Sequence, residues 1–428
     1  MLVSRALPRQ LLLISILVSV AGAGELKRRG LIGIRLSPVT DQLAEQLSLA
    51  SRDGIVVLSV IEGSAAEQAG LQANDVVIKV GGEPAPDFNR FGALLRGYGG
   101  GDAVTLTLLR AGETIDKRLT LGERPRESSD EFDVVYDEVL CGAHRLRTIL
   151  TRPKDAAAAP AVLLLPSLNN QTLEFQPQGA HPFKFLLYEL TKAGFVTLRV
   201  DLPGVGDSEG GPAQDATVAD HVRAFRSALD TLREYPFVDR KRVFLFGHGG
   251  GGALAALTAE GAPLAGVAVY GVFARPPAEF FPEALVRTWK LAAYEDDEIE
   301  RRAAAVRKFV AACFGEKRTP AAIFEAQPEL REIVAESLGV GDYISGRHYL
   351  YWQDLTDLNL AGSWKKLAAP TLVLWGEADF NTSREDHELI ARMVKAGVGG
   401  APANGRTGAA AVRGSGVGGG VGAGQGPA

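Results

Sequence analysis

The chain has 428 residues, of which 46% are hydrophobic, and its 46 basic and 51 acidic side chains give a formal net charge of −5. This length allows two or three domains and a sizeable core. The chain lacks the blocks of lysine and arginine that nucleic-acid-binding proteins carry, so we expect neither DNA nor RNA as a partner. It holds 50 glycines, roughly 20 more than an average usage of about 7% would give.

Residues 1–23 have the pattern of a secretory signal peptide. Arg5 and Arg9 form a short basic region, an almost unbroken apolar run covers 11–20, and Ala21-Gly22-Ala23 supplies small residues for cleavage. The apolar stretch, about 13 residues, is short against the ~20 that a spanning helix needs. We therefore expect cleavage, no stable membrane span afterwards, and an exported protein, periplasmic or extracellular. An uncleaved membrane anchor is the alternative.

Segment 30–121 predicts a unit of β-strands and short helices. Runs at 54–60 and 75–80 are rich in β-branched residues, and residues 104–108 alternate between apolar residues and threonine, as half-buried strands do. Between the two runs lies Gly63-Ser64-Ala65-Ala66-Glu67-Gln68-Ala69-Gly70-Leu71. Its small residues predict a tightly packed short helix, with a turn at the final glycine.

This motif resembles that of PDZ domains, particularly those attached to bacterial envelope proteases. PDZ domains add a peptide to a sheet edge as a strand and hold its C-terminal carboxylate with loop amides. The resemblance implies a carboxylate loop at 29–33, a pairing strand at 34–36 and a facing helix at 89–98. The peptide-binding residues would be Gly30, Leu31, Ile32, Gly33, Ile34, Phe91 and Leu94. A unit that packs on its neighbour and binds no peptide remains the alternative.

Residues 122–131 are charged and contain no apolar side chain, which is typical of a linker. After them, residues 132–394 alternate apolar runs with amphipathic segments, as in a mostly parallel sheet flanked by helices. We expect strands at 133–139, 144–150, 161–166, 195–201, 243–246, 266–271 and 371–376. We expect helices at 218–235 and 253–260, and a surface helix with one buried stripe at 296–314.

The second unit resembles an α/β-hydrolase of the esterase, lysophospholipase and serine-aminopeptidase branch. The resemblance rests on Asp201-Leu202-Pro203-Gly204-Val205-Gly206-Asp207-Ser208-Glu209-Gly210 and on Phe244-Leu245-Phe246-Gly247-His248. Residues 272–366 interrupt the alternation and would form a helical cap. The fold expected is therefore α/β: a PDZ domain of mixed β-structure with short helices, then an α/β-hydrolase domain with a cap, incomplete at its C-terminal strand.

In that family the turn G-x-S-x-G presents a serine nucleophile. This chain reads Gly247-His248-Gly249-Gly250-Gly251, so the outer glycines are present but the nucleophile position, Gly249, has no side chain. No serine, cysteine or aspartate lies between Arg242 and Thr258. The resemblance therefore predicts a vacant nucleophile position.

The other members of the catalytic machinery are only partly present. The turn after 371–376 places Asp379 where the family keeps its triad carboxylate, whereas the last histidine, His387, follows too soon and is expected on the next helix. The resemblance gives the backbone amides of Gly250 and Leu168 as oxyanion-hole donors. Removing one triad member leaves at most ~10³–10⁴-fold catalysis over water, and here two are missing. We expect no ordinary serine-hydrolase turnover.

The segment 396–428 has 13 glycines and 8 alanines among its 33 residues, and no acidic or aromatic side chain. Such a composition predicts disorder, because it cannot bury enough surface to offset the chain entropy. The final strand, histidine and helix of the fold are not found in it, so part of the core would be uncovered. One hypothesis is that this segment is an out-of-frame translation of a GC-rich gene.

Aromatic side chains gather in the second half of the cap. They would either line a site for an acyl or aromatic substrate group or pack the cap onto the core; they are Tyr343, His348, Tyr349, Tyr351 and Trp352. Three further histidines, at 144, 181 and 221, are expected on the surface. The two cysteines form neither a disulfide framework nor a metal site, and we expect no metal and no cofactor.

Three interpretations of function remain. The chain is an impaired hydrolase of esters or peptides; a non-catalytic envelope protein that uses its PDZ unit to capture peptide C-termini or extended peptides; or a degraded gene product. The glycine at position 249 is an in-frame change that a later frameshift does not explain. It therefore favours a pseudoenzyme lineage or an error-laden sequence over a frameshift alone.

Overall fold

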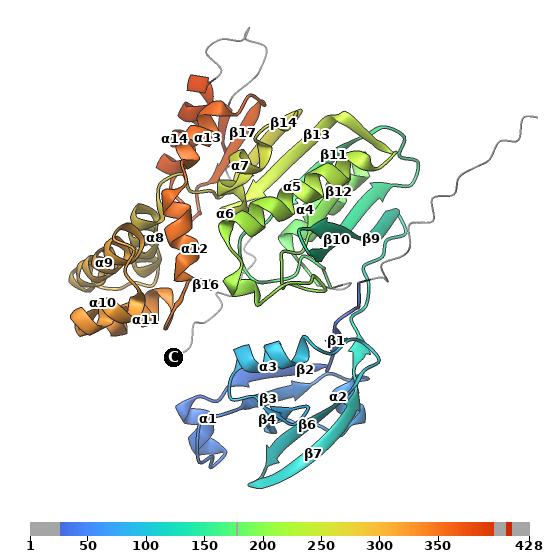
Figure 1. Ribbon diagram of the computed structural model, residues 1–428, viewed down its shortest axis with the longest axis vertical. Helices are drawn as coiled ribbons and strands as arrows, with labels where there is room; N and C mark the ends of the chain where they lie inside the picture. Colours follow the sequence, from blue (N-terminus) through green and yellow to red (C-terminus); the bar gives the residue numbers. More distant parts are fainter. Residues whose placement is uncertain (1–25, 177–178, 398–407, 413–428) are drawn as a thin grey trace, which may run out of the picture.

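The computed structural model of the protein describes residues 26–176, 179–397 and 408–412 (Figure 1). The signal peptide predicted at 1–23 lies outside the described residues, as does most of 396–428. None of the helices described is both long and apolar enough to cross a membrane.

The first unit is built on a six-stranded antiparallel sheet of order β2-β3-β4-β6-β7, with β5 paired to β4. This confirms a β-rich unit with short helices. Strand β2 lies at the sheet edge. The elements are β1 (Gly30–Leu31), β2 (Ile34–Pro38), α1 (Asp41–Gln46), β3 (Ile55–Val60), α2 (Ala65–Gln68), β4 (Val76–Val80), β5 (Glu83–Pro84), α3 (Phe88–Leu95), β6 (Ala103–Arg110), β7 (Glu113–Thr120) and β8 (Gly122–Glu123).

The glycine- and alanine-rich motif of this unit forms the expected short helix and turn. The Ser64 hydroxyl caps α2 by accepting a hydrogen bond from the Glu67 N–H (3.3 Å). Gly70 has a φ of +71°, which ends the helix in the left-handed region. These local features fix the chain's path from β3 to β4.

The second unit contains an eight-stranded sheet of order β18-β17-β14-β13-β11-β12-β10-β9. Strand β10 pairs antiparallel with both β9 and β12, and the remaining neighbours in the sheet pair parallel. All seven predicted strands are present, and the helix predicted at 253–260 corresponds to α7, with Ala253 ending the preceding helix α6. The elements are β9 (Phe132–Cys141), β10 (His144–Pro153), β11 (Ala159–Leu165), α4 (Pro182–Lys192), β12 (Val196–Val200), α5 (Val218–Glu234), β13 (Val238–His248), α6 (Gly249–Ala253), α7 (Ala255–Ala259), β14 (Gly266–Tyr270), β17 (Thr371–Gly376), α14 (Arg384–Gly397) and β18 (Gly408–Val412).

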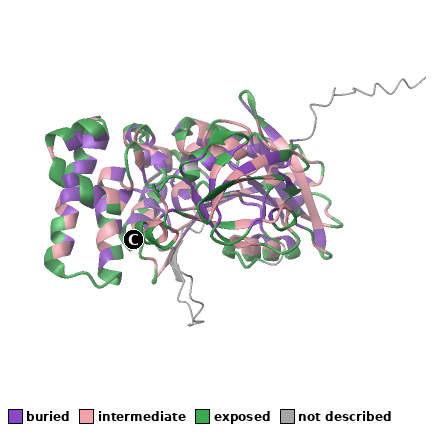
Figure 2. Cartoon of the chain, turned by 90° about the horizontal axis from the view of Figure 1, so that it is seen from below, coloured by how far each residue is buried: buried purple, intermediate pink, exposed green. Residues whose placement is uncertain are grey.

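The segment between β14 and β17 forms the predicted helical cap beside the sheet (Figure 1). In α9 and the turn after it, the expected stripe at 299, 303, 306, 310 and 313 is buried, and Figure 2 shows exposed positions on the outer sides of the cap helices. The elements are α8 (Pro277–Leu291), α9 (Asp296–Val310), a π-helical turn (Ala311–Gly315), α10 (Pro320–Ala326), α11 (Arg331–Leu338), β15 (Tyr343–Ile344), β16 (Arg347–His348), α12 (Tyr349–Asp357) and α13 (Leu360–Lys366).

The prediction that the sheet lacks its last strand, and that all of 396–428 is disordered, is wrong for residues 408–412. These residues form β18, parallel to β17, with Leu372 opposite Gly408 and Gly376 opposite Val412. Parallel pairing uses backbone N–H and C=O groups, so a segment of alanine and glycine can add to a free sheet edge without an amphipathic pattern. The glycine- and alanine-rich composition was therefore not a sufficient basis for predicting disorder at 408–412.

One face of the sheet is incompletely covered within the described residues. Val269 on β14 and Val373 on β17 are buried. On the opposite face, Tyr270 of β14 is half-buried and Leu372 of β17 is 42% exposed. Within the described residues, one side of these two strands is therefore more fully covered than the other.

Candidate functional site

The turn between β13 and α6 is as sharp as the sequence motif predicts. Gly249 follows the strand directly and has a φ of +55°. A Cβ atom on Gly247 would lie 2.6 Å from the Gly252 Cα, and one on Gly251 would lie 2.6 Å from the Leu165 carbonyl oxygen. Only glycine fits at these two positions, because strand, helix and the loop after β11 approach so closely.

The space beside Gly249 is occupied by a serine that sequence reasoning did not single out. A Cβ atom on Gly249 would lie less than 3 Å from the Ser167 Oγ and 3.2 Å from the Ser167 Cβ. Ser167 belongs to the loop after β11 and is half-buried. A signal was present in the sequence, since Ser167 immediately precedes the predicted oxyanion donor Leu168.

The structure brings the two predicted oxyanion residues together. A Cβ atom on Gly250 would lie 2.7 Å from the Leu168 Cδ1. The carbonyl of Leu168 accepts hydrogen bonds from the Arg347 Nε (3.2 Å) and Nη2 (2.9 Å). Arg347 is a buried cap residue, so the cap holds the loop that carries Leu168 against the turn at Gly250.

The predicted acid, Asp379, follows β17 and lies near the end of β14. Its Oδ1 accepts hydrogen bonds from the N–H groups of Asn381 and Thr382, both at 2.9 Å, and its Oδ2 accepts one from the Thr382 hydroxyl. A Cβ atom on Gly271 would lie 3.4 Å from the Asp379 Oδ2 and 3.5 Å from the His248 Nε2. The imidazole of His248 therefore lies on the same side of β14 as the acid. Burial lowers the pKa of His248, and the Asp379 carboxylate opposes that shift.

His387 lies on α14, as expected, and both of its ring nitrogens are engaged. Nδ1 donates to the Ser383 carbonyl (2.7 Å), and Nε2 accepts from the Val272 N–H (3.1 Å). Burial lowers its pKa. This histidine joins α14 to the loop after β14 and has no nitrogen left for a serine.

The expectation that His221 is a surface residue is wrong. His221 is fully buried on the inner face of α5, with its Nδ1 3.2 Å from the Tyr351 Oη. Burial lowers its pKa well below the usual value. The cap residues Tyr351 and Trp352 are buried as well, which agrees with the packing interpretation of the cap aromatics. Position 221 belongs to the buried, otherwise apolar face of α5. The sequence did not predict its burial, because histidine is polar.

The residues of the predicted peptide groove lie on β1, on the turn after it, on the edge strand β2 and on α3. A Cβ atom on Gly33, which has a φ of +85°, would lie less than 3 Å from the Ser64 Cβ, so this position requires glycine. Ile34 and Leu94 are half-buried, whereas Ile32 and Phe91 are buried in the core of the unit. Leu31 is exposed, and the close packing of Gly30 on Leu121 fixes the start of the loop.

The segment predicted to be a linker is anchored rather than free. Glu127 is buried, and it forms an ion pair with Arg199 and accepts a hydrogen bond from the Phe175 N–H (2.6 Å). The Tyr188 hydroxyl donates to the same carboxylate (2.7 Å). The charged residues of the linker segment therefore include a buried ion-pair partner as well as side chains exposed to solvent.

Comparison with known proteins identifies both units. The profile of the Alpha/beta hydrolase family matches residues 162–416, more than half of the chain, and the profile of the PDZ domain matches residues 30–121. Among solved structures, ferulic-acid-bound Est1E from Butyrivibrio proteoclasticus has a TM-score of 0.41 at 18% identity, covering 64% of this chain and 88% of that one. Proline iminopeptidase from Mycobacterium smegmatis has a TM-score of 0.39 at 22% identity, covering 61% and 87%.

Curated relatives match over a shorter stretch. A probable periplasmic serine endoprotease DegP-like of Rhizobium meliloti is 31% identical over 102 residues, and a probable periplasmic serine protease do/HhoA-like of Haemophilus influenzae is 34% identical over 94 residues. These stretches are 24% and 22% of this chain, and the chain spans only 20% of the length of either relative. On the family match, the chain belongs to the alpha/beta hydrolase family and carries a PDZ domain ahead of its hydrolase domain.

Proposed function

We propose that this protein is an exported peptide-binding protein in which the PDZ domain captures peptide C-termini or extended peptides. In this proposal the hydrolase domain is a scaffold that does not use the serine route of its family. The observation that carries it is the left-handed turn at Gly249, which has no nucleophile, with the Ser167 hydroxyl in the space beside it. Export is supported by the leader pattern at 1–23.

A fluorophosphonate probe tests the absence of a nucleophile. We expect no labelling of the native chain, because activation of a serine requires an adjacent base and both nitrogens of His387 are engaged. The matched control is Ser167→Ala. Labelling of the native chain that disappears in this variant would identify Ser167 as a nucleophile and overturn the scaffold proposal.

Peptide capture is tested on an array of decapeptides with free C-termini, followed by fluorescence anisotropy with the tightest binder. Leu94→Ala removes a half-buried side chain of the groove, and we expect its Kd to rise severalfold. Leu58→Ala, which changes an exposed leucine on β3, is the control and should bind like the native chain. If the native chain binds no peptide of the array, peptide capture is wrong.

Hydrolysis of a small ester or peptide is the second candidate. It is favoured by the closeness of Leu168 to Gly250, the two residues whose backbone N–H groups would be the oxyanion donors by the family resemblance. Turnover of p-nitrophenyl acetate that exceeds the turnover by a Gly250→Pro variant, which removes one donor N–H, would favour this candidate over the scaffold.

A further inference from the structure

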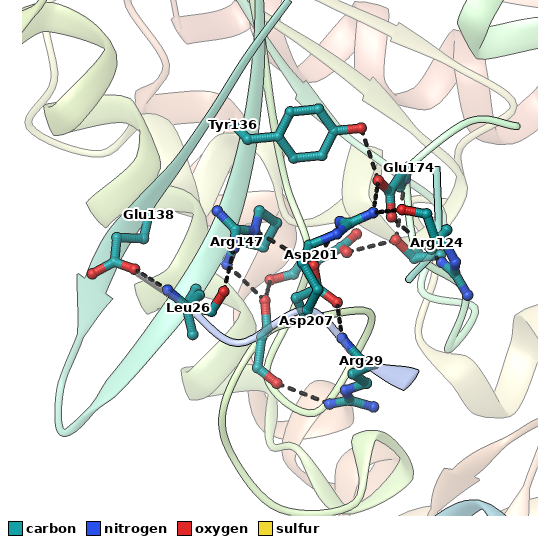
Figure 3. Close-up of polar contacts among 12 residues, drawn as sticks. Leu26, Arg29, Arg124, Tyr136, Glu138, Arg147, Glu174, Asp201 and Asp207 are labelled. Carbon is teal, nitrogen blue, oxygen red and sulfur yellow. Dashed lines mark hydrogen bonds and ion pairs between the residues drawn. The ribbon is translucent and has the colours of Figure 1, made fainter. Parts of the chain in front are cut away.

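The carboxylate loop of the PDZ domain begins at a residue that is bound to the hydrolase domain. The Arg29 N–H donates to the Asp207 Oδ1 (2.9 Å), and the Arg29 Nη2 donates to the carbonyl of Ser208 (3.0 Å) and, at 3.3 Å, to that of Gly204 (Figure 3). These acceptors all belong to the loop between β12 and α5. The first peptide group of the carboxylate loop is therefore held by the second domain.

Asp207 is also part of a buried ion-pair cluster. Its Oδ2 accepts from the Arg28 Nη1 (2.7 Å), and the Arg28 Nη2 donates to the Glu174 Oε1 (2.7 Å). The side chains of these three residues are 4–7% exposed. Removing one partner from such a cluster leaves an uncompensated buried charge, so the cluster resists rearrangement.

The same loop also pairs with the start of the linker, directly after Arg29. Strand β1 pairs antiparallel with β8, with Gly30 opposite Glu123 and Leu31 opposite Gly122. Residue Arg29 also forms a bridge with Gly99. The loop at 29–33 is thus fixed by the linker and by the hydrolase domain before any peptide arrives.

We propose that Asp207 of the hydrolase domain is a positioning residue for peptide binding, so that the two domains together build the site for a peptide C-terminal carboxylate. This inference rests on the proposed peptide capture. A loop whose amides already point in the binding direction loses less conformational freedom on binding, and this raises affinity. The ligand class is a peptide with a free carboxylate and an apolar last residue, since Ile34 and Leu94, the half-buried residues of the proposed groove, are apolar.

Reciprocal linkage follows from this arrangement. A ligand that favours one conformation of the loop at 29–33 must also favour the arrangement of residues 201–208 bonded to it. Peptide binding should therefore slow hydrogen exchange in the hydrolase domain at 201–208, although the peptide itself touches the PDZ domain.

The experiment compares the full-length native chain with Asp207→Asn and Asp207→Ala. The probe is the tightest array decapeptide, used as the free acid and as the C-terminal amide. Asparagine keeps an acceptor for the Arg29 N–H, whereas alanine removes it, so we expect the Kd of the free acid to rise about threefold and about tenfold, respectively. The Kd of the amide should stay within about twofold. Asp133→Asn, which breaks a half-exposed pair with Arg152, is the matched control and should change neither value.

Each outcome is decisive. Unchanged free-acid affinity in both Asp207 variants, or an equal loss for acid and amide, would overturn the positioning role. Hydrogen exchange without peptide gives a second test, because exchange at 30–34 should be faster in Asp207→Ala than in the native chain, and equal exchange contradicts the inference. If the native chain binds no peptide, the proposed function fails, and this exchange comparison still decides whether Asp207 holds the loop.

Discussion

The Ser167 hydroxyl lies less than 3 Å from the point that a Cβ atom on Gly249 would occupy. The two residues come from different strand ends, of β11 and β13, which pair side by side in parallel. The position that the family uses for its nucleophile is thus both devoid of a side chain and filled by a neighbour. A serine introduced at position 249 would therefore also require the Ser167 side chain to move or to be replaced.

We expect Gly249→Ser to fold with a loss of roughly 1–2 kcal/mol in the free energy of unfolding, because a non-glycine residue at a φ of +55° is strained. The close approach of Ser167 adds to this cost, so Gly249→Ser combined with Ser167→Gly should recover part of the loss. Neither variant should hydrolyse p-nitrophenyl acetate faster than the native chain. Hydrolysis by the double variant would show that a base is already in place beside Gly249.

The carboxyl of Asp201 should make stability depend on pH. Burial raises its pKa to about 6, above the unfolded value of about 3.9. The folded state therefore binds more protons between pH 4 and 6, and this group contributes stability at low pH that is lost as the pH rises through 6. The shift corresponds to about 3 kcal/mol.

Thermal unfolding of native and Asp201→Asn chains from pH 4 to 7 measures this contribution. The difference in Tm between the two should change in favour of the asparagine variant as the pH rises. Asparagine can still accept from the Leu173 N–H, which donates to the carboxyl at 2.7 Å. A pH-independent difference would show that the carboxyl titrates alike in the folded and unfolded chain.

The buried ion pair of Glu127 with Arg199 predicts a large effect from a residue in the linker segment. Glu127→Ala leaves Arg199 buried without this partner and should lower the free energy of unfolding by about 3–5 kcal/mol. Glu131→Ala, in the same segment, removes an exposed pair with Lys192 and should cost less than about 1 kcal/mol. Urea unfolding of both variants checks this, and equal effects would mean that the linker is not anchored through Glu127.

His387→Ala should destabilise the hydrolase domain by about 1–3 kcal/mol, since it leaves the buried Val272 N–H without its acceptor. Burial lowers the pKa of His387, so the unfolded state binds the proton first, and acidification below about pH 6.5 should destabilise the native chain through this residue. The alanine variant should lose that part of the pH dependence. The control is His144→Ala, an exposed residue on β10 that should unfold like the native chain.

The amino-acid sequence was sufficient to predict the two-unit organisation, the strands of the hydrolase sheet, the glycine at position 249 and the placement of Asp379 after a strand. These follow from periodicity and from short motifs, in which neighbouring residues specify a turn or a strand. The burial of His221 on α5 and of Glu127 in the linker could not be predicted from the sequence. Both residues are polar, and their burial depends on partners that are distant in the chain.

The three-dimensional arrangement was needed to show which residue occupies the space beside Gly249, that residues 408–412 extend the sheet, and that Asp207 bonds to Arg29. Each depends on groups far apart in the chain: Ser167 meets Gly249 across two strand ends, and Arg29 meets Asp207 across 178 positions. Such contacts arise from parallel strand pairing and buried charge, neither of which leaves a periodic trace along the chain.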